Sequence, residues 1–396
     1  MDINQKMYDL GNKRSVIREL FEYGKKRSKE IGEENVFDFS LGNPSVEPPK
    51  SVENAILEIL KTNSSISVHG YTSAPGDMNV REAIANNINK KFNAGVSAIN
   101  IYMTCGAAAS LTISLKALLN KDEECIVFAP YFTEYKVFIE NAGGNLVKSM
   151  PLKDTFQVDI VDFENKITEK TKAVIINSPN NPSGVVYTEQ TIKDIVNVIE
   201  KANKKYNKTI YIICDEPYRE LVYGDVKVPY LMNYYDNTII CYSYSKSLSL
   251  PGERIGYIAV NPKAKNSNDI YLAVCGAGRS LGYVCAPSLF QKVIGKNIDT
   301  ACDVSKYKDN RDLLLTNLQK LGYNCVKPDG AFYLFVKAFE EDANKFCERA
   351  KKHELLLVPC DDFGVEGYVR ISYCVPKERI IASIPAFEKL AREYKW

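Results

Sequence analysis

Short apolar runs alternate with helical hydrophobic patterns through the middle of the chain. Each apolar run is bounded by turn residues, which is typical of strands that are buried on both faces. Between the runs, apolar residues recur at helical spacing along one face. This alternation predicts an α/β fold in which helices wind around a mostly parallel sheet. The expected strands are 100–104, 124–128, 172–177, 210–215, 238–243 and 255–260, and the expected helical faces are Leu111, Leu115, Leu118 and Leu119, and Ile192, Ile195, Val196 and Ile199.

The pattern changes towards both ends of the chain. A chain of 396 residues is too long for one ordinary core, so two domains are expected. We predict a large domain at 49–295, with the N-terminal segment 1–48 and the C-terminal segment 296–396 forming a smaller domain together. Other expected features are an amphipathic helix around Ser15–Ile31, an N-cap at Thr188, an exposed loop at 261–268, hairpin-like strands around 331–336, and helices around 342–352 and 377–395.

Composition narrows the classes of function. The 51 basic and 49 acidic residues leave a formal charge of +2, which gives no sign of a nucleic-acid partner. The 11 cysteines are odd in number and lie mostly in apolar runs, so we expect reduced core thiols and a cytoplasmic protein. Neither a signal peptide nor a membrane span is expected, because no apolar run approaches about 20 residues. With only His69 and His353, a Ser-His-Asp triad or a multi-histidine metal site is not expected.

Polar and small residues follow the predicted strands directly. In an open α/β sheet, ligands bind beyond the carboxyl ends of the strands. Taken singly, each of these segments also has an ordinary explanation as a helix start, a turn, a capping aspartate or a surface lysine. One site would bring them all together. The segments are Cys105-Gly106-Ala107-Ala108-Ala109, Pro130-Tyr131-Phe132, Asn180-Asn181-Pro182-Ser183-Gly184, Asp215-Glu216-Pro217-Tyr218 and Ser243-Tyr244-Ser245-Lys246.

The segment from Ser243 to Gly256, SYSKSLSLPGERIG, resembles the lysine signature of the class I and II pyridoxal-phosphate aminotransferases. Asn181-Pro182-x-Gly184 and Asp215-x-x-Tyr218 precede it in the family's order, and Arg370-Ile371-Ser372 resembles the family's substrate arginine. The resemblance runs from Ser40 to Arg370. It implies a fold type I pyridoxal 5'-phosphate (PLP) dependent transferase, with a mostly parallel seven-stranded sheet in the large domain and a smaller α+β domain.

The resemblance also implies a role for each matched residue. Lys246 would hold PLP as a Schiff base and later act as the general base at the substrate's α-carbon. Asp215 would face the pyridine nitrogen and keep it protonated, so that the ring accepts electrons. Asn181 and Tyr218 would bind the ring oxygen, and Phe132 would stack on the ring.

The phosphate of PLP is expected to be bound by side-chain and backbone donors together. Members of the family often have a hydroxyl or a lysine where this chain has Ala108, so backbone N–H groups must contribute more here. Tyr71 resembles the tyrosine that reaches the phosphate in the neighbouring subunit, which implies a homodimer. The expected phosphate ligands in the same chain are Ser243, Arg254, the second hydroxyl candidate Ser245, and the backbone of Gly106, Ala107 and Ala108.

Substrate recognition is expected to depend on two arginines. Arg370 resembles the residue that grips the α-carboxylate, beside Gly42 and Asn181. Arg279 follows Lys246 at about the spacing of the arginine with which the neighbouring subunit of dicarboxylate-specific members binds the substrate's side chain. That spacing favours aspartate and glutamate, while a structural or loop role for Arg279 remains open.

The chemistry implied is a ping-pong transfer of an amino group between an L-amino acid and a 2-oxo acid. A PLP-dependent carbon–sulfur lyase and an alanine or aromatic aminotransferase remain open, because the same fold hosts them. A PLP-sensing transcription regulator is disfavoured, since no room for a helix-turn-helix precedes Ser40 and the chain has no basic excess.

Overall fold

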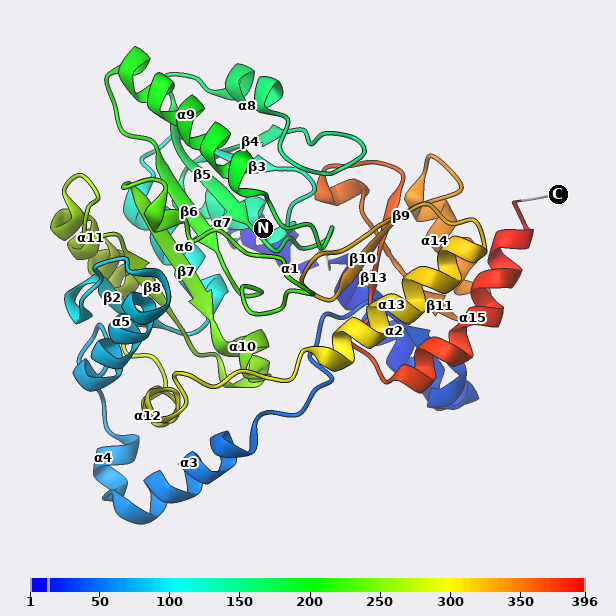
Figure 1. Cartoon of the computed structure of the whole chain (residues 1–396), viewed down its shortest axis with the longest axis horizontal. Helices are drawn as coiled ribbons and strands as arrows, with labels where there is room; N and C mark the ends of the chain where they lie inside the picture. Colours follow the sequence, from blue (N-terminus) through cyan, green and yellow to red (C-terminus); the bar gives the residue numbers. More distant parts are fainter. Residues whose placement is uncertain (1, 13–14, 395–396) are drawn as a thin grey trace.

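A seven-stranded sheet forms the centre of the larger part of the molecule (Figure 1). The computed structural model describes residues 2–12 and 15–394. The strand order is β2-β8-β7-β6-β5-β3-β4, and within this sheet only β8 runs antiparallel to its neighbours. The predicted α/β fold is therefore confirmed. The strands are β2 (Ile101–Thr104), β3 (Glu124–Phe128), β4 (Asn145–Ser149), β5 (Thr171–Asn177), β6 (Tyr211–Asp215), β7 (Thr238–Ser243) and β8 (Gly256–Val260).

The six predicted strands all form, and β4 is the strand that the hydrophobic pattern missed. Its sequence, NLVKS, lies at the edge of the sheet and keeps most of its side chains at least partly exposed. An edge strand that is half solvated carries no continuous apolar run, so it gives no strong sequence signal.

Helices cover both faces of this sheet. Along β5, Ala173 and Ile175 face one helical layer, whereas Val174 and Ile176 face the other. This alternation explains why the strands read as unbroken apolar runs. One layer contains α6 (Ala107–Leu118), α7 (Glu134–Ala142) and α11 (Ser267–Ser280), and the other contains α5 (Met78–Phe92), α8 (Ile160–Lys166), α9 (Glu189–Tyr206) and α12 (Ser288–Lys296). Helix α3 (Lys50–Thr62) packs against α12, away from the sheet (Figure 1).

A second, smaller core joins the two ends of the chain. Strand β1 (Phe37–Asp38) pairs in parallel with β11 (Leu355–Leu356), and a four-stranded sheet has the order β12-β13-β10-β9. The predicted strand around 331–336 corresponds to β10. The boundaries proposed at 48/49 and 295/296 remain predictions. The other elements are β9 (Cys325–Val326), β10 (Tyr333–Lys337), β12 (Val358–Pro359), β13 (Tyr368–Ser372), α2 (Val16–Ile31), α13 (Ser305–Lys320), α14 (Ala343–Lys351) and α15 (Lys377–Arg392).

Local sequence signals were right at two helix starts and largely right at one loop. Thr188 caps α9 as predicted, and Ser15 caps α2. The segment 261–268 was predicted as an exposed loop: residues 261–266 form no helix or strand and both lysines are exposed, while α11 begins at Ser267. Asn261, by contrast, is fully buried and donates to the carbonyl of Met232 at 3.2 Å. Residue 395, the expected end of the last helix, lies outside the described residues.

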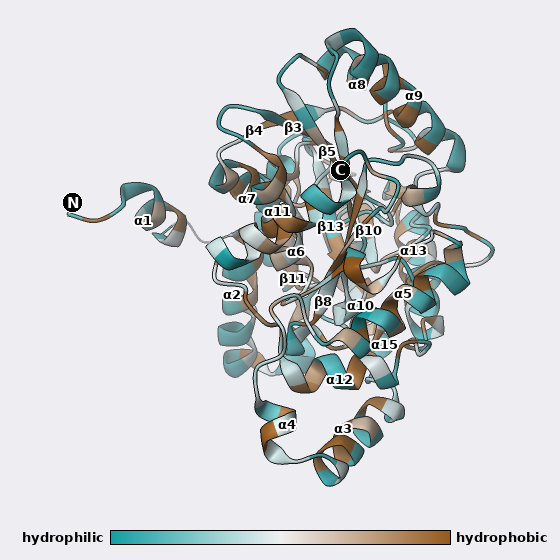
Figure 2. Ribbon diagram, turned by 90° about the vertical axis from the view of Figure 1, so that its left-hand side faces the viewer, coloured by the Kyte–Doolittle hydropathy of each residue, from teal (hydrophilic) through white to brown (hydrophobic). Residues whose placement is uncertain are grey.

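The short helices α1 (Gln5–Asn12) and α4 (Ser65–His69) lie at the periphery, and α1 projects from the body of the molecule (Figure 2). Within residues 2–12 and 15–394, no helix combines the length and the apolar character needed to cross a membrane. All 11 cysteines are free, and the buried ones are Cys125, Cys214, Cys241, Cys302, Cys347, Cys360 and Cys374.

Candidate active site

The carboxyl ends of β5, β6 and β7 meet at one edge of the sheet. Asn177 at the end of β5 pairs in register with Asp215 at the end of β6, and Asp215 pairs with Cys241 of β7. Strand β7 ends at Ser243, whose side chain caps the short helix α10 (Tyr244–Ser247) that carries Lys246. A cavity of about 360 Å³ opens at this edge. The predicted residues that line it are Gly42, Ala107, Ala108, Phe132, Asn181, Asp215, Tyr218, Ser243, Ser245, Lys246, Arg254 and Arg370.

The amine of Lys246 is held in place within the cavity. Its Nζ donates to the carbonyl oxygen of Gly42 at 2.8 Å. Burial lowers the pKa of Lys246 to about 8; Cys374 opposes this shift, whereas Arg254 and Arg370 add to it. A lysine reacts with a carbonyl group only through its neutral amine. The surroundings of Lys246 therefore raise the neutral fraction near physiological pH.

Position 42 has no room for a side chain, so a glycine is needed there. A Cβ on this residue would lie 2.1 Å from the hydroxyl oxygen of Tyr333. The carbonyl of Gly42 is an acceptor and is used by Lys246, so it has no part in binding a carboxylate in this arrangement. The predicted substrate role of Gly42 remains a prediction.

Asp215 is buried with its two carboxylate oxygens in different environments. Oδ2 accepts a hydrogen bond from the hydroxyl of Tyr135 at 2.5 Å, and the side chain of Asn177 donates to the Asp215 main-chain carbonyl at 2.9 Å. Oδ1 is buried and has no hydrogen-bond partner among the described residues. Burial raises the pKa of Asp215 to about 7; the Tyr135 hydrogen bond opposes this shift and Glu216 adds to it.

Arg370 is almost fully buried, at 2% exposure. Its Nη1 donates to Oδ1 of Asn181 at 3.1 Å, and its Nη2 donates to the carbonyl of Ser40. Asp38 in turn fixes Ser40 by accepting from its backbone N–H at 2.8 Å and its hydroxyl at 2.6 Å. Within the described chain, Nε of Arg370 has no partner. A buried guanidinium with an unused donor is suited to binding an anion.

The predicted phosphate ligands also converge. Helix α6 begins after Gly106, and a Cβ on Gly106 would lie 2.9 Å from Nη2 of Arg254. The hydroxyl oxygens of Ser243 and Ser245 are 2.7 Å apart. A helix N-terminus, an arginine and two hydroxyls therefore surround one part of the cavity, an arrangement that suits a phosphate.

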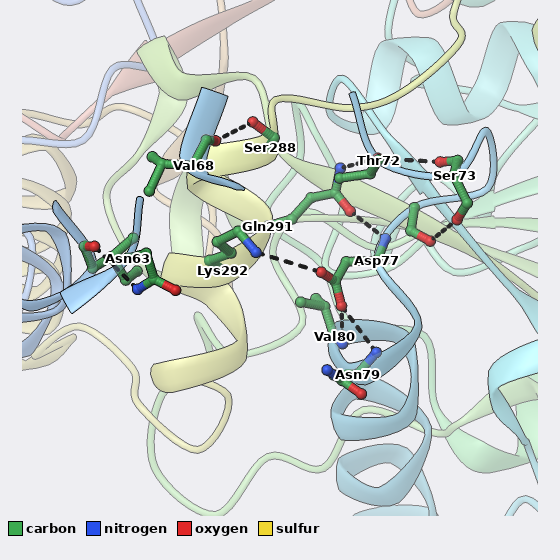
Figure 3. Close-up of polar contacts among 12 residues, drawn as sticks. Asn63, Val68, Thr72, Ser73, Asp77, Asn79, Val80, Ser288, Gln291 and Lys292 are labelled. Carbon is green, nitrogen blue, oxygen red and sulfur yellow. Dashed lines mark hydrogen bonds and ion pairs between the residues drawn. The ribbon is translucent and has the colours of Figure 1, made fainter. Parts of the chain in front are cut away.

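Tyr71 and Arg279 do not line the cavity formed by their own chain. Tyr71 is 98% exposed, and Arg279 is exposed in the last turn of α11. Figure 3 shows that α12 anchors the loop beside Tyr71: the Gln291 side chain accepts from the backbone N–H of Asp77 at 2.7 Å and donates to the hydroxyl of Thr72 at 3.2 Å. The loop is thus held, while the almost fully exposed Tyr71 lies outside the lining of its own chain's cavity.

The residues missed from the sequence include three that hydrogen-bond predicted site residues. Asn177 ends a predicted strand, so the rule of inspecting strand ends was sufficient to find it. Tyr135 lies in the first turn of α7, shortly after Phe132 in the sequence, which is a weaker signal. Tyr333, which lines the cavity and hydrogen-bonds Tyr218 through the two hydroxyls at 2.8 Å, comes from the distant strand β10, and no local pattern marked it.

Comparison with known proteins identifies the family. The family model for aminotransferase class I and II matches residues 34–382. The chain belongs to this family. It is a transaminase, and the members of its family are PLP-dependent.

Similar proteins span nearly the whole length of this aminotransferase. A solved aminotransferase from Eubacterium rectale is 54% identical and covers 100% of both chains, with a TM-score of 0.98. The aspartate aminotransferase of Thermotoga maritima is 32% identical over 90% of this chain and 91% of its own. A probable aspartate/prephenate aminotransferase of Aquifex aeolicus is 30% identical over 91% of this chain and 92% of its own.

Proposed function

We propose that Lys246 binds PLP covalently, that Asp215 pairs with the cofactor's ring nitrogen, and that aspartate or glutamate is the preferred amino donor. The observation that carries the cofactor assignment is the unpartnered, buried Oδ1 of Asp215 in the same cavity as the Lys246 amine. A protonated ring nitrogen would supply the missing donor and remove the cost of burying an unpaired acceptor.

The rest of the cavity fits the same cofactor. Ser243, Ser245, Arg254 and the start of α6 would hold its phosphate. Phe132 offers a ring face, and the Asn181 amide together with the Tyr218 hydroxyl would bind the ring oxygen. Bound PLP supplies an electron sink for the pair of electrons released at the substrate's α-carbon.

The chain's own residues would bind the substrate and move the proton. Arg370 would hold the α-carboxylate, and the Nε that lacks a partner supports this role. Once the substrate's amine has displaced it, the Lys246 amine would take the proton from the substrate's α-carbon. It would then deliver this proton to the cofactor carbon that had carried the aldehyde. Its lowered pKa suits it to both steps at neutral pH.

Recognition of the substrate's side chain is proposed to involve a second copy of the chain. Apart from Lys246, Arg254 and Arg370, no cationic side chain of the described residues lines the cavity. Since the described lining offers no further cation for a distal carboxylate, Arg279 of a partner copy would supply that charge. Tyr71 of the partner would likewise complete the phosphate site, which makes a homodimer the proposed active unit.

One observation favours a second candidate substrate class. Glu134 lines the cavity, and its carboxylate would repel a distal carboxylate that is not neutralised by a cation. Phe132 and Ile17 line the same cavity and would accommodate an apolar side chain. Aromatic or other neutral amino acids are therefore the alternative donors.

The test is a product assay on the purified protein with PLP, 2-oxoglutarate and a panel of amino acids. Oxaloacetate formed fastest from aspartate would support the dicarboxylate assignment. Phenylpyruvate or pyruvate as the dominant product would replace it with the neutral class. Ammonia and sulfide released from cysteine without amino transfer would contradict both, because these are the products of a lyase.

A further inference from the structure

The two oxygens of the Asp215 carboxylate are held asymmetrically. Oδ2 accepts from the hydroxyl of Tyr135 at 2.5 Å, and Nδ2 of Asn177 lies 3.5 Å from the same oxygen. Oδ1 has no partner among the described residues. One oxygen is therefore fixed by the protein, while the other is left open.

The hydroxyl of Tyr135 stays protonated and therefore acts as a hydrogen-bond donor. Tyr135 is 2% exposed in α7, and its ring packs edge-on against Phe132 at a centroid distance of 5.8 Å. Burial raises the pKa of Tyr135 well above its ordinary value, and the negative charge of the nearby Asp215 adds to this shift. The hydroxyl therefore keeps its proton. A hydroxyl that cannot ionise stabilises a neighbouring carboxylate by donating to it.

We propose that Tyr135 is a positioning residue that holds Oδ2 of Asp215, leaves Oδ1 free for the ring N–H of PLP, and favours the ionised form of the carboxylate. The inference rests on the proposed pairing of Asp215 with the cofactor and adds the residue that acts through it. It also explains why a tyrosine is buried with its hydroxyl directed at a carboxylate.

The other groups around Asp215 do not replace Tyr135. Glu216, the next residue, adds negative charge and disfavours ionisation of Asp215. Tyr218 uses its hydroxyl on Tyr333. Cys214 and Cys241 are buried thiols whose pKa values are raised by burial, so they add no charge. Of the described residues, Tyr135 makes the shortest hydrogen bond to this carboxylate.

The experiment measures the affinity of the purified protein for pyridoxamine phosphate between pH 5.5 and 9. This form of the cofactor has no aldehyde, so condensation with Lys246 does not contribute. Binding should strengthen as Asp215 ionises. In Tyr135→Phe we expect the midpoint of this pH dependence to move upward, with affinity at pH 7 reduced by roughly ten-fold, because a hydrogen bond to a charged group is lost. The matched control is Tyr187→Phe, since Tyr187 is a buried tyrosine with no hydrogen bond to Asp215 among the described residues.

Each outcome decides between the assignments. A midpoint that is the same in wild type, Tyr135→Phe and Tyr187→Phe would overturn the inference, whatever happens to thermal stability. Wild-type protein that binds neither PLP nor pyridoxamine phosphate would instead overturn the proposed function. If Tyr135→Phe does not fold, Tyr135→Met removes the donor with a more adaptable side chain and should show the same shift. Tyr135→His restores an N–H donor and should return the midpoint towards the wild-type value.

Discussion

The two parts of the proposed site differ in how completely one chain builds them. Lys246, Asp215 and Arg370 line one cavity, and all three are buried or partly buried. Tyr71 and Arg279, in contrast, are exposed and line no part of that cavity. From this comparison we propose that one subunit contains the residues that carry out amino transfer itself. Selection of the substrate's side chain and completion of the phosphate site are then proposed to depend on a second subunit.

The largest effect is expected at Lys246. Lys246→Ala removes both the covalent anchor and the general base, so turnover should fall below detection in an assay of oxo acid formation. The exposed Lys265→Ala serves as the control and should keep wild-type activity. Near-wild-type transamination by Lys246→Ala would refute the assignment of the buried half of the site.

Asp215→Asn should lower kcat by orders of magnitude while some cofactor remains bound, because the ring nitrogen loses its charged partner. The same change should stabilise the cofactor-free protein. Burial raises the pKa of Asp215 from 3.8 to about 7. The stability that this carboxyl contributes is therefore fully present below pH 3.8 and is lost as the pH rises through about 7.

Thermal unfolding of the cofactor-free proteins checks this second effect. At pH 8 the Asp215→Asn variant should unfold at a higher temperature than wild type, by an increment worth roughly a few kcal/mol. At pH 4 the two melting temperatures should converge. If the variant is less stable than wild type at pH 8, then the buried, ionised Asp215 does not destabilise the cofactor-free protein, and the prediction is wrong.

Arg279→Ala sharpens the contrast between the buried and the exposed parts of the site. If a partner's Arg279 binds a distal carboxylate, kcat/KM for aspartate should fall by roughly 10- to 100-fold, whereas that for alanine should change little. The exposed Arg392→Ala is the control. Equal losses with both amino acids, or none, would leave Arg279 a structural role only.

The smallest effect is expected from the loop that carries Tyr71. Gln291→Leu removes the hydrogen bonds to Thr72 and Asp77 and should weaken PLP binding by a few-fold if Tyr71 contacts the partner's cofactor. Ser288→Ala removes only a hydrogen bond to Val68 of α4, outside this loop, and should leave PLP affinity unchanged. Fluorescence titration with PLP compares the two variants.

Much of the fold followed from the sequence because the central strands are buried on both faces and read as apolar runs. The edge strand β4 was missed since solvent on one side breaks such a run. The candidate site residues at the strand ends and in the lysine motif could be predicted because both signals are local in sequence. Tyr333 could not be found in this way, since β10 reaches the cavity only through the packing of the smaller core. The unpaired oxygen of Asp215 is likewise a property of packing and has no sequence signal.

The measurement that tests the central claim most directly is borohydride reduction of the PLP-loaded protein, followed by proteolysis and mass spectrometry. The account predicts a single labelled peptide, modified at Lys246, and no label in Lys246→Ala. A label on a different lysine, or a protein that stays colourless and unlabelled when saturated with PLP, would contradict it.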